Sequence, residues 1–426
     1  MQQRQASRPR LIQALVDAFT LPDLRRRILF TLGVFVIFRF IAHIPVPGVN
    51  PDALKTIFDQ NQFLGMLDLF SGGAMRNFSI VAMGVYPYIT ASIIMQLLVP
   101  VIPSLQALSK EGEAGRNKIN LYTHWLTVPL ACLQGYGELV LLRRGDGIAD
   151  AGSLGTVTII VSLAAGTMFM VWLGELIQER GIGNGISMII FAGIVAGIPD
   201  MINRGFIAPD KMIALLGFAL LALATVVLIV IFTEAHRRIP VHYSRSVFRG
   251  RKMYRQSGAT HIPLRVNTAG MIPLIFAMSL VILPQTVSSY FHGGMADFFQ
   301  NWSDHWSYWL LFFVLVVGFA FFYTMVIFEQ MELAATLQKQ GGFIPGVRPG
   351  QATSTYLSQV VNRITWAGAL FLGVVAVAPF ILRRLTGVEV VTLSSTSILI
   401  MVGVALDTMK QLEAQLLMRR YEGFLK

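Results

Sequence analysis

Long apolar runs recur along this chain and alternate with short polar stretches. A helix needs about 20 predominantly apolar residues to cross a bilayer, so runs of that length with little or no charge indicate membrane spans. The pattern predicts ten such segments. They begin near Ile28, Phe78, Leu121, Val157, Ile186, Ile213, Ala269, Trp306, Ile364 and Val390. We therefore expect an all-α, multi-pass membrane protein with ten transmembrane helices.

The stretch from Phe63 to Pro100 departs from this pattern of regular, full-length apolar segments. Its first part, Phe63 to Arg76, is apolar but well short of a span, and Ser71 to Gly73 breaks it. A half-helix at membrane depth is tolerated only where protein or a water-filled cavity surrounds it, so we expect a re-entrant segment inside a cavity. The second part, Phe78 to Ile102, is long enough to span, but Gly84 and Pro87 interrupt its middle.

Two pairs of aliphatic residues share a four-residue spacing at these irregular places. Val85 and Ile89 lie at the interruption, and Ile186 and Ile190 follow a turn rich in glycine. Residues four apart lie on one helical face. The pairs are consistent with one apolar constriction, or with the ordinary packing of a kinked helix. The glycines at 181, 183 and 185 do not fit a dinucleotide loop and predict a tight turn that opens the fifth segment.

Composition and charge support the membrane assignment and orient the chain. Of the residues, 54% are hydrophobic and 13% charged, against about 25% charged in soluble proteins. Of the 34 Lys and Arg residues, 25 fall on one set of alternating ends and 8 on the other. This asymmetry predicts that both termini are cytoplasmic. Isolated ionisable residues inside segments favour structural pairing over a proton relay. These are Arg39, Glu138, Glu175 and Asp407.

Ten segments divide into two halves of five. Because five is odd, a duplicated unit would be inverted relative to its twin, with the working site at the interface of the halves. The expected organisation is a cytoplasmic N-terminal segment, two five-helix halves and a cytoplasmic tail. The boundaries are 1–27, 28–202 with the re-entrant segment 63–76, 203–412 with cytoplasmic loops 233–268 and 329–363, and 413–426.

The two long cytoplasmic loops have different characters. Arg237 to Arg265 holds eight basic residues, no acidic one and interleaved aromatics. This composition suits RNA phosphates or an acidic protein surface, although a basic loop could also serve only to fix topology on anionic lipid. Glu329 to Asn362 contains GGFIPGVRPGQ, whose prolines and glycines predict a rigid tip that displays Arg348.

Enzyme signatures are missing from the chain. It has no H-E-x-x-H, G-x-S-x-G or G-x-x-x-x-G-K-[ST] motif, and its seven histidines lack metal-ligand spacing. We therefore expect no catalysis, cofactor or metal. A secondary transporter with inverted repeats is the alternative reading, but it would place polar ligands at the midplane. An intramembrane protease or lipid enzyme would need a nucleophile and a base.

Several motifs together resemble the SecY family, whose members form the channel of the general protein-secretion translocon. The resemblance covers essentially the whole chain and fits the bacterial type. The motifs are Phe70-Ser71-Gly72-Gly73, Tyr86-Pro87-Tyr88-Ile89, Gly112-Glu113-Ala114-Gly115-Arg116, Glu179 to Ser187, and Pro345 to Gly350. The resemblance implies two inverted five-helix halves around an hourglass pore in the plasma membrane. Unfolded chains would pass through it, and signal sequences would leave through a lateral gate of segments two, three, seven and eight.

The resemblance also assigns residues. It implies a pore ring of Val85, Ile89, Ile186, Ile190, Ile275 and Ile400. The plug would contain Phe63, Leu67, Phe70, Ser71, Gly72, Gly73 and Met75. Docking of the SecA motor ATPase or the ribosome would use Arg249, Arg251, Lys252, Arg255 and Arg348. SecE and SecG-type small subunits, signal peptides, nascent chains and anionic lipid are the other implied partners. Val85 in place of the usual Ile, and Glu329-Gln330 in place of Asn-Pro, depart from the family pattern.

Overall fold

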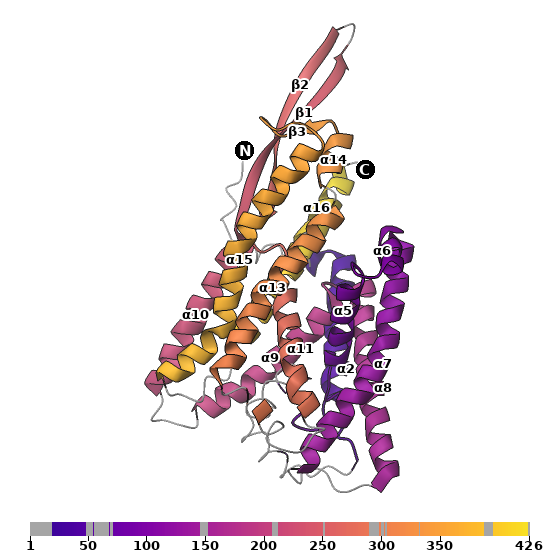
Figure 1. Cartoon of the computed structure of the whole chain (residues 1–426), viewed down its shortest axis with the longest axis vertical. Coiled ribbons are helices and arrows are strands. Elements are labelled where there is room, and N and C mark those ends of the chain that lie inside the picture. The colour runs from indigo at the N-terminus through magenta and orange to yellow at the C-terminus, as the bar shows by residue number, and fades with distance from the viewer. Residues whose placement is uncertain are drawn as a thin grey trace. The chain divides into compact units, whose positions relative to one another are not determined.

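The chain is predominantly helical (Figure 1). The computed structural model describes residues 19–47, 54, 68, 71–144, 152–206, 212–249, 252–288, 298–299, 302, 305–331, 333–386 and 395–424. The chain divides into two compact units. Unit 1 comprises Met1–Met212, Ile282–His305 and Ile400–Lys426, and unit 2 comprises Ile213–Val281 and Trp306–Leu399.

Each of the ten predicted segments contains a helix. These helices are α2 (Pro22–Ile41), α5 (Tyr86–Leu98), α7 (Glu113–Arg144), α8 (Gly152–Arg180), α9 (Gly185–Phe206), α10 (Met212–Glu234), α11 (Ile272–Ser288), α13 (Trp306–Met331), α15 (Gln351–Thr386) and α16 (Ser395–Phe424). Within the described residues, three helices are long and apolar enough to cross a membrane: Gly152–Arg180, Trp306–Lys339 and Gln351–Ala378. Tyr86–Leu98 and Pro103–Lys110, bent by 98°, would together make a fourth. The ten-span count stays a prediction.

Two segment boundaries differ from expectation. The second segment is not helical from Phe78, because residues 72–78 and 80–85 form turns, Ser79 forms a β-bridge with Pro45, and α5 begins only at Tyr86. Pro87 lies in the first turn of α5, where its missing N–H has no intrahelical role, so it starts this helix rather than interrupting it. The fifth segment is longer than its apolar run, since α9 continues through Pro199 to Phe206.

Small residues bring the helices of unit 1 into close contact. A Cβ at Gly185, the first residue of α9, would lie 1.7 Å from the Gly174 carbonyl oxygen on α8, so the two helices touch through their backbones. The turn before α9 is the tight one that the glycines predict: Gly183 has φ +92° and donates its N–H to Gln411 Oε1 of α16 at 3.1 Å. Thr31 of α2 accepts from the N–H of Ile182 at 3.2 Å. This turn therefore joins α2, α8, α9 and α16.

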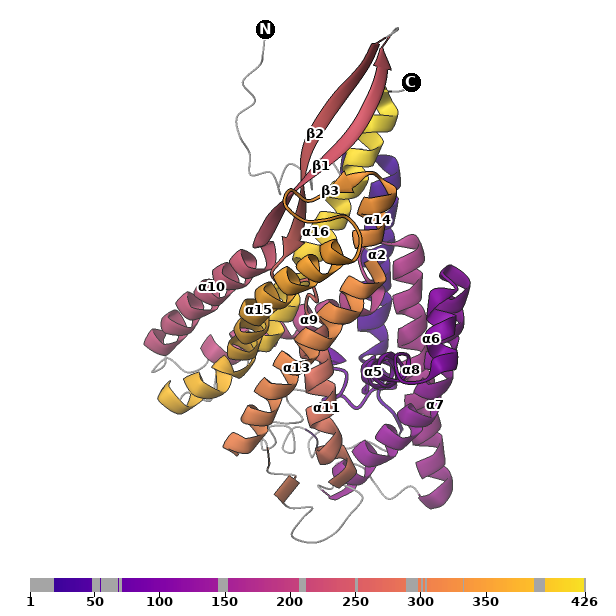
Figure 2. The same ribbon diagram turned by 45° about the horizontal axis from the view of Figure 1, so that its top comes forward.

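Unit 2 contains a long β-ribbon, so the expectation of an all-α chain is wrong here. Strands β1 (His236–Arg249) and β2 (Lys252–Arg265) pair antiparallel along their whole length, with Arg249 opposite Lys252. Strand β3 (Gly342–Phe343) pairs with β1 at His242 and Tyr243. Figure 2 shows the ribbon extending past β3 and α14 (Leu333–Lys339).

The ribbon has its own hydrophobic core. Apolar side chains from β1, β2, α14, the β3 turn and the start of α15 pack together: Ile239, Val241, Leu264, Leu337, Ile344, Leu357 and Val361. Gln340 Oε1 also accepts a hydrogen bond from the Tyr243 hydroxyl of β1 at 3.5 Å. The two long loops predicted from the sequence are therefore one folded module, which we call the ribbon module (residues 236–265 and 333–361).

Candidate functional site

The break at Ser71 to Gly73 is the end of a helical turn. Gly72 and Gly73 have φ +68° and +83°, which L side chains adopt only with strain. The Gly73 N–H donates to the Asp68 carbonyl at 3.0 Å. This is the six-to-one hydrogen bond of a Schellman helix end, with Gly72 at its left-handed position. The chain therefore leaves the helical conformation at the break that the sequence predicts, while the predicted segment before Asp68 lies outside the described residues. We call Asp68 together with residues 71–76 the plug turn.

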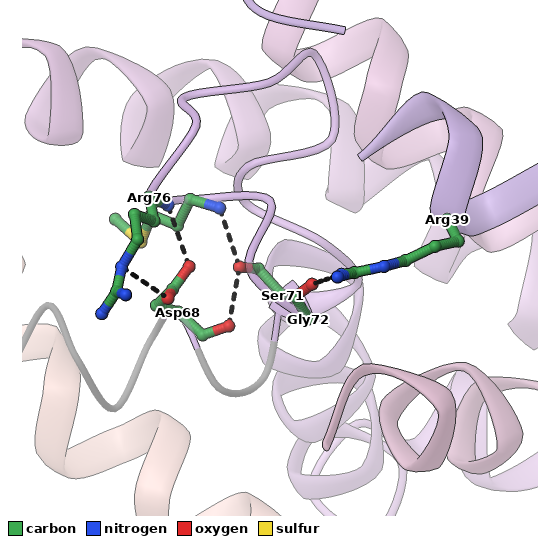
Figure 3. Close-up of polar contacts among 6 residues, drawn as sticks. Arg39, Asp68, Ser71, Gly72 and Arg76 are labelled. Carbon is green, nitrogen blue, oxygen red and sulfur yellow. Dashed lines mark hydrogen bonds and ion pairs between the residues drawn. The ribbon is translucent and has the colours of Figure 1, made fainter. Parts of the chain in front are cut away.

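Hydrogen bonds inside the plug turn fix its shape (Figure 3). The Ser71 hydroxyl donates to the Asp68 carbonyl at 3.0 Å and accepts from the Met75 N–H at 2.9 Å. Asp68 Oδ1 accepts from the Arg76 N–H at 2.9 Å, and its other oxygen lies 3.5 Å from Arg76 Nε. Asp68 is nearly buried. The carboxylate therefore joins the two ends of the turn, and these contacts are internal to it.

Two helices of unit 1 hold the plug turn from outside. Arg39, in the last turn of α2, donates from Nη1 to the Gly72 carbonyl oxygen, approaching from the side opposite Asp68 (Figure 3). A Cβ at Gly72 would lie 2.7 Å from Gly193 Cα on α9 and 3.1 Å from Phe38 Cζ on α2. The backbone of the turn is thus seated directly against α9.

The contact with α9 falls on a particular face of that helix. Ile186, Ile190 and Gly193 follow one another at spacings of four and three residues, so they share one side of α9. Gly193 on this face touches the plug turn. At the start of α9, Ile186 Cδ1 also lies close to Gly174 of α8. The plug turn therefore contacts the α9 face that carries two of the predicted ring residues.

The predicted ring residues are distributed over both units. Val85 and Ile89 lie one helical turn apart, because the Ile89 N–H donates to the Val85 carbonyl at 3.1 Å. In unit 1 Val85, Ile89, Ile190 and Ile400 are buried and Ile186 is half-buried, while in unit 2 Ile275 is half-buried on α11. All six remain candidates for the ring.

Other predicted site residues lie partly outside the described residues. Phe63, Leu67 and Phe70 of the plug and Arg251 of the ribbon are not described. Arg249 ends β1, and Lys252 and Arg255 lie on β2, so these three occupy the distal part of the ribbon. Ser71, Gly72, Gly73 and Met75 belong to the plug turn.

Arg348 lies at an exposed, well-supported tip of the ribbon module. Gly346 and Gly350 on either side of it have φ +82° and +100°. The Arg348 carbonyl accepts from the Thr353 hydroxyl at 2.8 Å, and Ile344 anchors the turn in the module's core. Arg348 is exposed at this turn as the sequence predicts, while the rigidity of the tip and its docking role stay predictions.

Two of the four predicted ionisable residues, Glu175 and Arg39, make polar contacts in unit 1. Glu175 Oε1 on α8 accepts from Asn120 Nδ2 at 3.1 Å and lies 3.0 Å from His124 Nε2 on α7. Because the His124 contact is not aligned as a hydrogen bond, Asn120 is the better-oriented partner. Together with the Arg39 contact, this agrees with structural pairing for these two residues, whereas the buried Oε2 of Glu138 has no hydrogen-bond partner among the described residues. Among the described residues no cluster of His, Cys, Asp and Glu could hold a metal.

Sequence reasoning missed one polar contact near the second segment. Gln134 of α7 donates to the Thr90 hydroxyl of α5 at 3.5 Å, and both residues are buried. Gln134 in an apolar stretch of the sequence could have indicated this contact, because a buried polar side chain requires a hydrogen-bond partner.

Comparison with known proteins places this geometry in a family. Residues 79–409 match the family model described as SecY. The chain belongs to the SecY family. It is 43% identical to protein translocase subunit SecY of Streptomyces lividans, over 98% of this chain and all of that protein. It is also 41% identical to the same subunit of Thermotoga maritima, over 97% of this chain and 98% of the relative.

Solved structures share the SecY-family fold. A protein-conducting channel matches with a TM-score of 0.63 at 17% identity, over 92% of both chains. A SecY structure reported for its plug domain, which stabilises the closed state of that channel and maintains a membrane seal, has a TM-score of 0.62 at 18% identity over the same shares. Sec61 in the canine ribosome-channel complex gives 0.59 at 16% identity, again over 92% of both chains. At these identities the likeness establishes the fold.

Proposed function

We propose that this SecY-family chain forms the protein-conducting channel of a bacterial secretion translocase and has no catalytic activity of its own. The observation that carries the proposal is the alignment of 98% of the chain with the full length of a protein translocase subunit SecY at 43% identity. The channel would pass unfolded polypeptides across the plasma membrane. It would also release signal sequences and membrane helices sideways through a gate formed by α5, α7, α11 and α13.

The proposed seal has two parts, an aliphatic ring and a plug. Val85, Ile89, Ile186, Ile190, Ile275 and Ile400 carry no charge or hydrogen-bonding side chain. Such a ring can dewet and close without offering a binding site to a passing chain. The contact of the plug turn with Gly193, on the face of α9 that bears Ile186 and Ile190, supports a plug that sits beside this ring.

The proposed topology places both termini in the cytoplasm, with ten spans in two inverted halves. The excess of Lys and Arg on one set of alternating ends supports this orientation. It puts the ribbon module on the cytoplasmic side. The boundaries proposed for the two halves are those expected from the sequence, 28–202 and 203–412.

The ribbon module is the proposed docking site for the partner that drives translocation. Arg249, Lys252 and Arg255 lie on its distal strands, and this concentration of basic residues suits an anionic partner. The exposed Arg348 belongs to the same module, so both elements would engage one partner, SecA or the ribosome. SecE and SecG-type subunits and anionic lipid are the further proposed partners.

Crosslinking to a stalled precursor tests the channel proposal. A photoreactive residue would replace Ile89 or Ile275 in the chain, assembled with its small subunits in vesicles, and a secretory precursor would be halted in transit. Adducts at both positions are expected. Trp125, which is 72% exposed on α7, is the control for lipid-facing positions and should give none. Import without adducts at Ile89 and Ile275, or equal adducts at Trp125, would overturn the proposed path.

A further inference from the structure

Arg39 is a charged residue in an otherwise apolar part of α2. Arginine inside a membrane segment is costly and needs a partner that compensates for the lost water. Its guanidinium donates to a main-chain carbonyl, that of Gly72, 33 residues further along the chain. The acceptor belongs to the plug turn and not to α2. The sequence separation and the choice of acceptor both point to a role in holding that turn.

We propose that Arg39 is the positioning residue that keeps the plug turn seated against α9 while the channel is closed. The inference rests on the proposed function, because it assigns a residue to the closed state of that channel. Arg39 would act through the plug turn and would make no contact with a translocating chain. Opening the channel would require this hydrogen bond to break.

The contacts of the plug turn divide into those that shape it and those that seat it. The hydrogen bonds among Asp68, Ser71, Met75 and Arg76 lie within the segment and can move with it as one body. The contacts of Gly72 with Phe38 and Gly193 are van der Waals contacts that join the turn to α2 and α9. Arg39 supplies a directional, charge-assisted bond between the turn and its surroundings. It is therefore suited to fix the position of the turn without affecting its shape.

The position of Arg39 on α2 favours this role. It lies in the last turn of the helix, where the macrodipole stabilises a cation. Phe38, the preceding residue, is 3% exposed and anchors this turn of α2 in unit 1. The guanidinium therefore projects from a fixed support, and its bond to Gly72 restrains the turn relative to the helix.

A simpler interpretation is that Arg39 stabilises α2 and the Gly72 carbonyl merely supplies its guanidinium with a hydrogen-bond acceptor. The two readings differ in what happens when the plug is removed. If Arg39 acts through the plug turn, its substitution has no further effect on leakage once the turn is gone. If it stabilises α2 alone, its effect persists.

The test measures ion leakage from vesicles that contain the full chain with its small subunits and no precursor. R39M removes the donor and keeps a long apolar side chain. We expect it to raise leakage about tenfold, the effect of losing one charge-assisted hydrogen bond from the closed state. R143M is the matched control, because Arg143 of α7 donates to Thr156 of α8 at 2.7 Å, and it should leave leakage unchanged. R39K retains the charge on a shorter donor and should fall between wild type and R39M.

The decisive comparison repeats R39M in a chain whose residues 63–76 are replaced by a Gly/Ser linker. There we expect no additional leakage from R39M. Unchanged leakage in the intact chain, or the same increment in both backgrounds, overturns the proposal. If the R39M chain fails to insert into the membrane, the same test compares the leakage of R39K with that of wild type, in the intact chain and in the chain without the plug. Precursor import by wild-type vesicles is measured in parallel. Absence of import would refute the proposed channel function, and the leakage comparison between variants could still be interpreted.

Discussion

Replacing Gly72 with alanine should release the plug turn from its seat. Gly72 has φ +68°, and a Cβ there would lie 2.7 Å from Gly193 Cα. Both atoms belong to backbones, so no side-chain rotation relieves the contact. Either the plug turn or α9 must move, and α9 is fixed to α8 through the close backbone contact of Gly185 with Gly174. We therefore expect G72A to displace the turn and open a leak.

Two costs contribute to the effect. An L residue in the left-handed region costs about 1–2 kcal/mol relative to glycine. Forcing an extra methyl group into a packed contact costs about 1–3 kcal/mol more. Local unfolding of the turn would relieve part of the cost of the left-handed conformation. The cost of the clash with Gly193 applies only while the plug turn is seated against α9. The clash alone should reduce the ratio of seated to displaced plug about 5-fold to 150-fold.

Gly73 provides a matched control for this prediction. It too has positive φ, +83°, but among the described residues the nearest atom to its Cβ would be Arg39 Nη1 at 3.6 Å, an ordinary contact. G73A therefore pays for backbone strain without the clash. Conductance across planar bilayers, measured without precursor, should rank G72A well above G73A, and G73A at or slightly above wild type. Equal conductance in G72A and G73A would refute the argument that the seat against Gly193 matters.

Three further predictions follow from other parts of the chain. I190N buries an unpaired amide, which costs about 1–3 kcal/mol. The variant should raise leakage and allow export of precursors with defective signals. Unchanged export of those precursors would contradict this prediction. R348E should lower motor-driven import about tenfold without changing the melting temperature, whereas R348K should retain most of it; equal import by both would exclude the tip from docking. G185A places a Cβ 1.7 Å from the Gly174 carbonyl oxygen and should lower the melting temperature of the detergent-solubilised protein. G318A, whose Cβ would have no atom of the described residues within 4 Å, should not.

The helices were accessible from sequence because each carries its own signal. Ten apolar runs predict ten segments, and a helix occupies each one. The glycine turn between α8 and α9 was also predictable, since closely spaced glycines mark backbone conformations that other residues avoid. The start of α5 was harder to place. Phe78 to Val85 is as apolar as the helix that follows, and its turns depend on tertiary contacts such as the hydrogen bond from Val46 N–H to Phe78 O.

The ribbon was missed although a signal for it exists. Ile239, Val241 and Tyr243 alternate with polar residues and prolines, which is the period of a strand with one buried face. The density of positive charge obscured that pattern and favoured a loop. The partner surface comes from β3, α14 and α15, about 70 or more residues further along the chain. No local pattern reports such a contact, so the ribbon module could not be assembled from sequence alone.

The contacts that seat the plug turn explain why its sequence could be read only in part. Arg39 binds a main-chain oxygen of Gly72, and the opposing surface on α9 is the backbone of Gly193. Contacts of this kind depend on where backbones lie, and apart from Arg39 they require glycine rather than any particular side chain. The apolar residues of the segment can then vary while the seat persists. It follows that substitutions at Gly72, Gly193 and Arg39 should disturb the closed channel more than conservative exchanges at Met75, whose N–H is the atom bonded to Ser71.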